Sequence, residues 1–424
     1  MGETKPQQPL RLDTAYIPAL DGLRAIAILI IAWYHIWQQS WLSPTFYITN
    51  SMGIRIRTIS LEIWPRTGYL FVDLMLLLSA FCLFLPHARA MVFGDPLPDI
   101  GTFYKKRISR ILPSYWFCVL LLFFVALFQN AWPTAGEAIR DLLLTLSFTQ
   151  TFCVPAYLHS KITGVLWTAA IEMQFYLIFP LLAACFRKKP LVTFAALVGA
   201  QELYLRGFVL RSSADVLRFA FNQLPGFLGI FATGMMAAYL YILAAKVLDG
   251  KPILRALPLC SIAGFFLALQ GIDWVQHTAA GAQNVQIIQT SHRLPLMLFF
   301  GLLVLSFAFG GRLFAAIFGN RVMKFFAGIS YNLYIWHQWL ACRLKDWRIP
   351  YWEGTEYPNF TGNRPWQEKY TAVVFLVSIA VAVLLTYLLE RPANRTMLRI
   401  LNDAMPPKHT LDAAEQPDIS AREV

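Results

Sequence analysis

The chain has 424 residues, of which 57% are hydrophobic and only 14% are charged, and its mean hydropathy is +0.51. Apolar runs long enough to cross a bilayer recur along nearly its whole length. This composition excludes a soluble globular protein and indicates one integral membrane domain. The formal net charge of +12 is interpreted as the excess of Lys and Arg that cytoplasmic loops carry, so the expected partner is the lipid bilayer and not nucleic acid.

Apolar windows of about 20 residues predict an all-α integral membrane protein with about ten transmembrane helices. The predicted spans are 22–41, 68–86, 111–130, 164–186, 191–210, 217–245, 257–271, 293–311, 325–343 and 370–390. The segment 138–152 is short and contains two charged residues, which favours an interfacial or re-entrant helix over a further span. With ten spans, most Lys- and Arg-rich connections lie on the N-terminal side of the membrane, so both termini are predicted to be cytoplasmic.

The chain divides into three predicted parts. Residues 1–17 form a polar cytoplasmic segment without the features of a cleavable signal peptide, residues 18–396 form the transmembrane domain, and residues 397–424 form a polar tail that is predicted to be disordered. The six cysteines show neither a CxxC motif nor a Cys/His metal spacing, so no metal site is expected.

The first predicted span contains two cations, Arg24 and His35. Eleven residues at roughly 100° each complete about three turns, so both side chains share one helix face, about 16 Å apart along the axis. If Arg24 lies at one membrane surface, His35 lies near the midplane. An ionisable residue at that depth is a candidate functional residue, although a histidine satisfied by another helix is the alternative.

A second basic motif follows the second span, where Arg107 and Arg110 are three residues apart. In a helix they project from nearly the same side, and two guanidinium groups suit the oxygens of a nucleotide-like diphosphate. The alternative is a basic anchor at the level of the lipid headgroups.

Other polar residues lie inside the predicted spans. Glu172 has Tyr176 one turn further on the same helix face, and its carboxylate could orient a histidine, accept a proton or form a structural pair. Asp73 lies near the outer end of the second span, where a structural role is somewhat favoured. Tyr334 and His337 belong to one polar stripe of the ninth span, which is predicted to face protein or a water-filled cavity, with His337 toward the outer side.

Taken together, these residues resemble the acyltransferase-3 family of integral membrane acyltransferases. The matching blocks occur in family order over residues 16–396: Arg24 to His35 after Leu-Asp-Gly-Leu, 72–81, Arg107-Ile-Ser-Arg110, 166–176, 329–337 and Glu390-Arg-Pro392. The sequence departs from the family pattern at three places: Ala80 replaces a usual Gly, Met173 replaces a common second Glu, and Gln338-Trp339 replaces a frequent Trp-Pro.

The resemblance implies a ten-helix core that takes an acyl group, commonly acetyl, from cytoplasmic acyl-CoA and passes it to a carbohydrate or lipid-linked acceptor. It identifies Arg24 and His35 with the family's essential Arg/His pair, and Arg107 and Arg110 with its Arg-x-x-Arg motif. We accordingly predict His35 and Glu172 as catalytic residues, and Arg24, Arg107, Arg110, Tyr176, Tyr334, His337 and Asp73 as binding residues, with acyl-CoA as donor and no metal.

Two other classes of protein fit parts of the pattern. A transporter of a glycolipid or organic anion would also need polar residues at the midplane and a basic rim, but it often has internal repeats, which the sequence lacks. A receptor or scaffold would need neither the histidine nor the arginine pair. The expected location is a bacterial inner or plasma membrane, with a eukaryotic membrane as the alternative.

Overall fold

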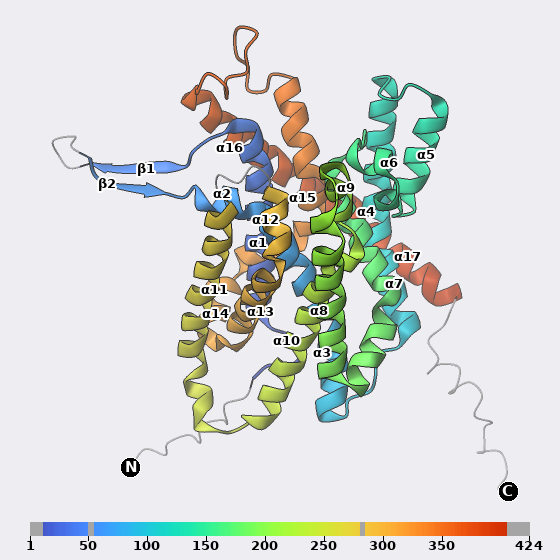
Figure 1. The fold of residues 1–424 in the computed structure, drawn as a ribbon, viewed down its shortest axis with the longest axis vertical. Coiled ribbons are helices and arrows are strands. Elements are labelled where there is room, and N and C mark those ends of the chain that lie inside the picture. The colour runs from blue at the N-terminus through green and yellow to red at the C-terminus, as the bar shows by residue number, and fades with distance from the viewer. Residues whose placement is uncertain (1–11, 50–54, 280–284, 405–424) are drawn as a thin grey trace, which may run out of the picture.

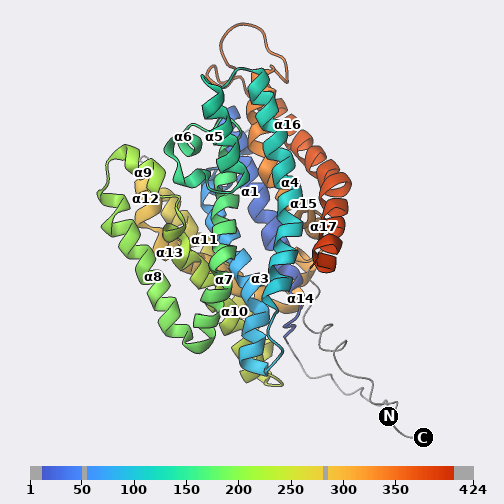
Figure 2. The ribbon, with the colours of Figure 1, turned by 90° about the vertical axis from the view of Figure 1, so that its right-hand side faces the viewer.

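The computed structural model describes residues 12–49, 55–279 and 285–404. Helices packed side by side make up most of this part of the chain (Figures 1 and 2). One antiparallel hairpin interrupts them, formed by β1 (Thr45–Thr49) and β2 (Arg55–Ser60). The prediction of a helical membrane protein is confirmed, and the hairpin lies in the connection between the first two predicted spans.

Among the described residues, seven stretches of helix are long and apolar enough to cross a membrane, and two bent helix pairs raise the number to as many as nine. The seven are α1 (Pro18–Ser40), α2 to α3 (Ile63–Thr67 and Phe71–Phe93), α4 (Ile100–Phe128), α7 (Trp167–Lys188), α10 (Leu228–Val247), α11 (Leu257–Ala279) and α16 to α17 (Arg364–Leu385 and Arg391–Ala404). The bent pairs are α12 with α13 (Val285–Ser291 and Arg293–Phe309, 66°) and α14 with α15 (Gly311–Phe318 and Arg321–Asp346, 67°).

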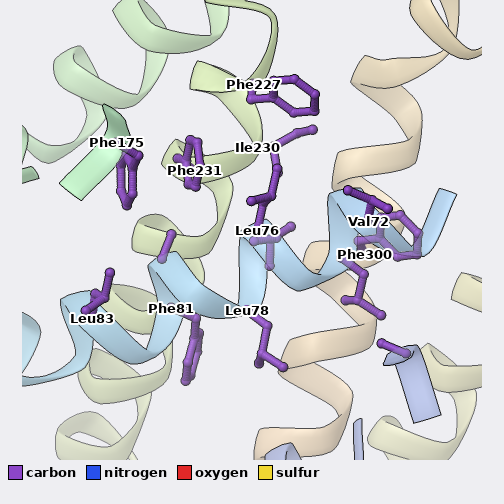
Figure 3. Close-up of a cluster of buried hydrophobic side chains, with 14 of the residues drawn as sticks. Val72, Leu76, Leu78, Phe81, Leu83, Phe175, Phe227, Ile230, Phe231 and Phe300 are labelled. Atoms are coloured by element: carbon purple, nitrogen blue, oxygen red, sulfur yellow. The ribbon is translucent and has the colours of Figure 1, made fainter. Parts of the chain in front are cut away.

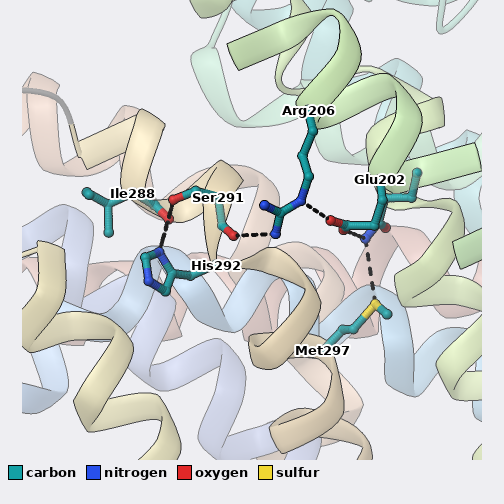
Figure 4. Close-up of polar contacts among 7 residues, drawn as sticks. Glu202, Arg206, Ile288, Ser291, His292 and Met297 are labelled. Carbon is teal, nitrogen blue, oxygen red and sulfur yellow. Dashed lines mark hydrogen bonds and ion pairs between the residues drawn. The ribbon is translucent and has the colours of Figure 1, made fainter. Parts of the chain in front are cut away.

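The fifth predicted span, 191–210, forms helix α8 (Pro190–Gly207), which is not among these candidates. Its last two turns contain Gln201, Glu202 and Arg206, and these polar groups tie α8 to the bend between α12 and α13 (Figure 4). Arg206 Nε lies 2.7 Å from Glu202 Oε2 and its Nη2 donates to the Ser291 carbonyl oxygen, while Gln201 donates to Met297 Sδ. The polar side chains at the C-terminal end of α8 therefore contribute to its packing against α12 and α13.

The apolar segment 138–152 does not cross the bundle. It forms α5 (Ala135–Leu146) and a 3-10 turn at Gln150–Phe152, followed by the short helix α6 (Val154–Leu158). None of these is among the candidate spans.

The predicted span 217–245 is interrupted in the structure. Residues 214–220 form a separate helix, α9, and α10 begins only after a 3-10 turn at Leu224–Phe227. Pro225 accounts for the break, because proline lacks an amide hydrogen and disfavours helix at the residue before it. Arg293 Nη1 donates to the carbonyl oxygens of Phe221 and Gly226 at 3.1 and 3.2 Å, so a buried side chain satisfies backbone groups that the broken helix leaves free.

The chain alternates between two ends of the bundle. At one end Arg89, near the end of α3, contacts Asp95 and Thr14, and Lys246 of α10 donates to the Val92 carbonyl oxygen. The opposite end carries the hairpin and the connection between α15 and α16 (Figure 1). Residues 397–404 of the predicted tail continue α17, while the first eleven residues and 405–424 lie outside the described residues.

A buried core of apolar side chains joins α3 to α7, α10 and α13 (Figure 3). The rings of Phe175 and Phe231 stack at 3.7 Å between centroids, and Phe71 meets Phe300 edge to face at 5.8 Å. Gly234 lets α10 approach α3 closely, because a Cβ atom there would lie 2.2 Å from the carbonyl oxygen of Leu77. This packing fixes the face of α3 that lines the site.

Candidate active site: two cavities that meet at Val72 and Tyr334

Two neighbouring cavities lie between the helices and share only Val72 and Tyr334 among their described lining residues. We call the first the arginine cavity; it is lined by Arg24, Val72, Met75, Leu76, Ser79, Cys82, Leu83, Arg107, Arg110, Ile111, Thr168, Ala169, Glu172, Tyr176, Ser330, Tyr331 and Tyr334. We call the second the histidine cavity; its lining includes Tyr34, His35, Tyr69, Val72, Asp73, Trp167, Arg218, Asn222, Gln289, Tyr334 and Gln338. Every residue predicted for the site except His337 lines one of these cavities.

The arginine cavity gathers three guanidinium groups. Arg24 of α1 lies between Asp21, 3.9 Å away, and Cys82 Sγ, to which it donates at 3.7 Å. Arg107 and Arg110 of α4 complete the set, and the Arg107 guanidinium lies 5.9 Å from the centre of the Tyr176 ring. With one carboxylate among the described lining residues, the cavity carries an excess of positive charge and suits an anion.

The Asp21 carboxylate beside Arg24 has a tyrosine, Tyr16, as a hydrogen-bond partner. Tyr16, just before the helix, donates a hydrogen bond to the Asp21 carboxylate. Burial and this carboxylate raise the pKa of Tyr16 to about 12, so the hydroxyl keeps its proton at neutral pH. Tyr16 therefore holds Asp21 in place beside Arg24.

Among the described residues that line the arginine cavity, the one acidic group is Glu172 on α7. Ser79 Oγ donates to Glu172 Oε1 at 2.7 Å, and the Tyr176 hydroxyl donates to the same oxygen. Ser79 and Tyr176 also contact each other at 3.2 Å. The predicted i, i+4 neighbours therefore do meet, and the hydrogen bonds of Glu172 hold α7 against α3.

Two histidines from distant parts of the sequence form a direct pair between α1 and α15. His337 Nε2 lies 2.9 Å from His35 Nδ1. His337 Nδ1 contacts the Leu333 carbonyl oxygen at 3.0 Å, and His35 Nδ1 contacts that of Ile31 at 3.2 Å. Because a carbonyl oxygen only accepts, each Nδ1 carries a hydrogen in this network. His337 Nε2 is therefore the acceptor for the Nδ1–H of His35.

This pairing assigns the tautomer of a neutral His35. Its Nδ1 holds the proton, and its Nε2 keeps the lone pair with which an imidazole takes up a proton. His35 lines the histidine cavity, and within the described residues its recorded hydrogen bonds all involve Nδ1. The arrangement can act as a general base at Nε2, with His337 orienting the ring.

The third polar feature is a buried ion pair on the histidine side. Arg293 Nε lies 3.4 Å from Asp73 Oδ2, and the two side chains are 0% and 2% exposed. The Arg293 guanidinium also lies 4.4 Å from the centre of the Phe227 ring. Asp73, which the sequence suggested as a binding residue, thus faces a cation of its own protein.

The sequence did not single out Arg293, nor the contact between the histidines. A search of the sequence for charge partners would have found Arg293. It and Asp73 are isolated charges beside apolar runs, and a buried charge needs a partner. Nothing local signals the second, since it joins residues 302 positions apart. Within the described residues, no group of three or more His, Cys, Asp and Glu side chains is placed to hold a metal ion.

The fold and the site define a multi-pass integral membrane protein with a cation-rich interior and an imidazole pair beside it. Residues 17–391 match the family model described as "Acyltransferase domain", so the chain belongs to the acyltransferase-3 family.

Among curated proteins, it is 24% identical over 342 residues to the O-acetyltransferase OatA of Staphylococcus aureus, covering 76% of this chain and 50% of OatA. ORF330 of Acidianus two-tailed virus, provisionally named an acetyltransferase, is 23% identical over 76% of this chain and 82% of its own length. YrhL of Bacillus subtilis, provisionally named a peptidoglycan O-acetyltransferase, is 28% identical over 39% and 23%.

The chain thus spans about half the length of OatA. No solved structure is significantly similar to it.

Proposed function

We propose that this protein is a membrane O-acyltransferase that moves an acyl group, most simply acetyl, from cytoplasmic acyl-CoA to a hydroxyl group of a glycan, glycolipid or other lipid-linked acceptor. One observation carries the proposal: His35 lines the histidine cavity and contacts His337, and the Nδ1 atom of each ring faces a backbone carbonyl oxygen. The family and the names of its relatives support the reaction class.

In this proposal the arginine cavity takes the donor. Arg24, Arg107 and Arg110 bind the phosphates of acyl-CoA, because paired guanidinium groups match phosphate oxygens with charge and hydrogen bonds. The thioester then reaches the histidine cavity past Val72 and Tyr334. The acceptor hydroxyl enters the histidine cavity, whose tryptophan, tyrosine and amide side chains suit a carbohydrate.

The chemical step uses the free nitrogen of His35. Its Nε2 takes the proton of the acceptor hydroxyl, the oxygen attacks the thioester carbonyl, and a C–O bond forms while the C–S bond breaks. The protonated imidazole then returns its proton to the departing thiolate of CoA. His337 keeps the Nδ1–H of His35 directed at one acceptor throughout. A transient acyl-imidazole at the same nitrogen is the second route.

The membrane topology in this proposal has ten spans with both termini in the cytoplasm. The nine candidates become ten if α8 crosses the membrane, and the arginine cavity then opens toward the cytoplasm. Residues of one predicted side, such as Arg89 and Lys246, lie together at one end of the bundle, which supports this alternation.

The test supplies isotope-labelled acetyl-CoA to membranes that contain the wild-type protein or the variant His35→Ala. We expect label in a glycan or lipid fraction with the wild-type protein and about 10²–10⁴-fold less with the variant. A transporter, the second candidate, would move a glycolipid or organic anion without consuming acetyl-CoA. Undiminished labelling by folded His35→Ala protein would refute the proposed chemistry.

A further inference from the structure

The point where the two cavities meet is formed by two side chains on different helices, Val72 of α3 and Tyr334 of α15. We call this pair the constriction. The ring of Tyr334 lies 5.7 Å from that of His337, so the constriction is next to the histidine pair. In the proposed reaction, the acyl group that travels from the arginine cavity to His35 passes these two side chains.

Tyr334 is held in place by hydrogen bonds to another helix. Thr168 Oγ1 donates to the Tyr334 hydroxyl at 2.7 Å, and the Tyr334 hydroxyl contacts the carbonyl oxygen of Val165 at 3.4 Å. Thr168 Oγ1 also lies 3.0 Å from the Val165 carbonyl oxygen, so its one hydrogen is shared between two acceptors. These contacts tie the phenol to the start of α7, so its ring cannot swing aside without breaking buried hydrogen bonds.

Val72 is held by its neighbours in the chain. Asp73 pairs with the fully buried Arg293, and Phe71 packs edge to face against Phe300. Valine in a helix has one strongly preferred rotamer, and Val72 is only 8% exposed. Both side chains of the constriction are therefore held in place by their surroundings.

We infer that Val72 and Tyr334 restrict the donor to unbranched acyl groups, which deepens the proposed function and rests on it. A thioester whose phosphates stay with the arginines brings its carbonyl to His35 only by sending the acyl group through the constriction first. An unbranched acyl chain has about the same cross-section as the cysteamine and β-alanine parts of the pantetheine arm that follow it. A branch at the carbon next to the carbonyl adds one methyl group at the narrowest point.

One misplaced methyl group in a well-packed pocket typically changes specificity about 10- to 200-fold. We therefore expect the wild-type protein to use acetyl-CoA and propionyl-CoA at least about tenfold better than isobutyryl-CoA. The variant Val72→Ala removes two methyl groups from the constriction and raises the isobutyryl-to-propionyl rate ratio by about tenfold. Val72→Ile adds a methylene and lowers propionyl transfer relative to acetyl transfer.

Two control variants separate the effect of the constriction's width from other effects of a substitution on α3. Val72→Thr keeps the branched shape and leaves the isobutyryl-to-propionyl ratio unchanged. Met75→Ala removes a side chain from the arginine cavity alone, on the same helix, and also leaves the ratio unchanged. Initial rates with the three donors, normalised to monodisperse protein in detergent, measure these ratios.

An unchanged ratio in folded Val72→Ala, or an equal shift in Met75→Ala, overturns the inference. If Val72→Ala does not fold, the comparison of propionyl with acetyl transfer in Val72→Ile decides it. A wild-type protein that transfers no label from acetyl-CoA refutes the proposed function itself. A wild-type protein that transfers acetyl and isobutyryl groups equally well refutes only the role of the constriction.

Discussion

The arginine cavity and the histidine cavity differ in how their charges are balanced. Three guanidinium groups line the first, against one carboxylate among its described lining residues, Glu172, which is already hydrogen-bonded to two hydroxyls. In the second cavity, Asp73 forms an ion pair with the buried Arg293, and Nδ1 of His35 donates a hydrogen bond to Nε2 of His337. The first cavity thus has an excess of positive charge that can bind a ligand. The second has an imidazole nitrogen, Nε2 of His35, whose lone pair is available. Variants on each side should therefore fail in different ways.

The largest effect is expected from His35→Ala, which removes that lone pair. Acyl transfer should fall about 10²–10⁴-fold because the general base at His35 Nε2 is lost, while binding of CoA should be nearly unchanged. Rates of labelled acetyl transfer and CoA binding on the same preparation measure the two effects. His277→Ala, an exposed histidine on α11, is the matched control and should keep wild-type rates.

The second largest effect is expected from His337→Ala, which leaves the His35 ring without its acceptor. Where a carboxylate orients a catalytic histidine, its loss costs about 10⁴-fold in kcat. A neutral imidazole orients the ring without stabilising its charge, so we expect about 10²-fold here. His337→Gln can place an amide oxygen near the Nε2 position and should recover part of the rate.

The kinetic measurements must distinguish two roles of His337, orienting the His35 ring and packing between α1 and α15. If His337 only fills space between α1 and α15, the Ala and Gln variants will lower kcat equally, or will change the KM for the donor and leave kcat intact. Recovery of kcat in His337→Gln, together with an unchanged KM for the donor, supports the orienting role.

The contrast between the cavities also explains what could be predicted from the sequence. The spans follow from local hydropathy, and the grouping of Arg107 with Arg110 follows from helical spacing. The His35–His337 contact depends on how α1 packs against α15, for which no local pattern exists. The break before α10 was missed, although Pro225 and the polar residues Asn222 and Gln223 marked the place.

The third effect is expected on the donor side, from the double variant Arg107→Ala/Arg110→Ala. Each guanidinium lost from a phosphate removes a charge-assisted contact, so the affinity for CoA should fall about 10- to 100-fold, and its dependence on salt should weaken. Titration of CoA at low and high ionic strength measures both. Arg187→Ala, at the end of α7 and outside both cavities, should change neither. Unaltered affinity in the double variant would remove the phosphate role.

The smallest effect on turnover, but a clear effect on stability, is expected from Asp73→Asn. It leaves the Arg293 charge buried and unpaired, and breaking a buried ion pair in this way typically costs about 3–5 kcal/mol in the free energy of unfolding. Asp273→Asn breaks the half-exposed pair with His277 and should cost less than about 1 kcal/mol. Thermal unfolding in detergent compares the two.

If Asp73 instead binds the acceptor, Asp73→Asn will raise the KM for the acceptor at a temperature where the protein is still folded, and the stability loss will be no larger than in Asp273→Asn. A large stability loss with an unchanged KM assigns Asp73 to the support of the constriction. The ion pair would then serve catalysis only by holding the first turn of α3, and with it Val72, in place.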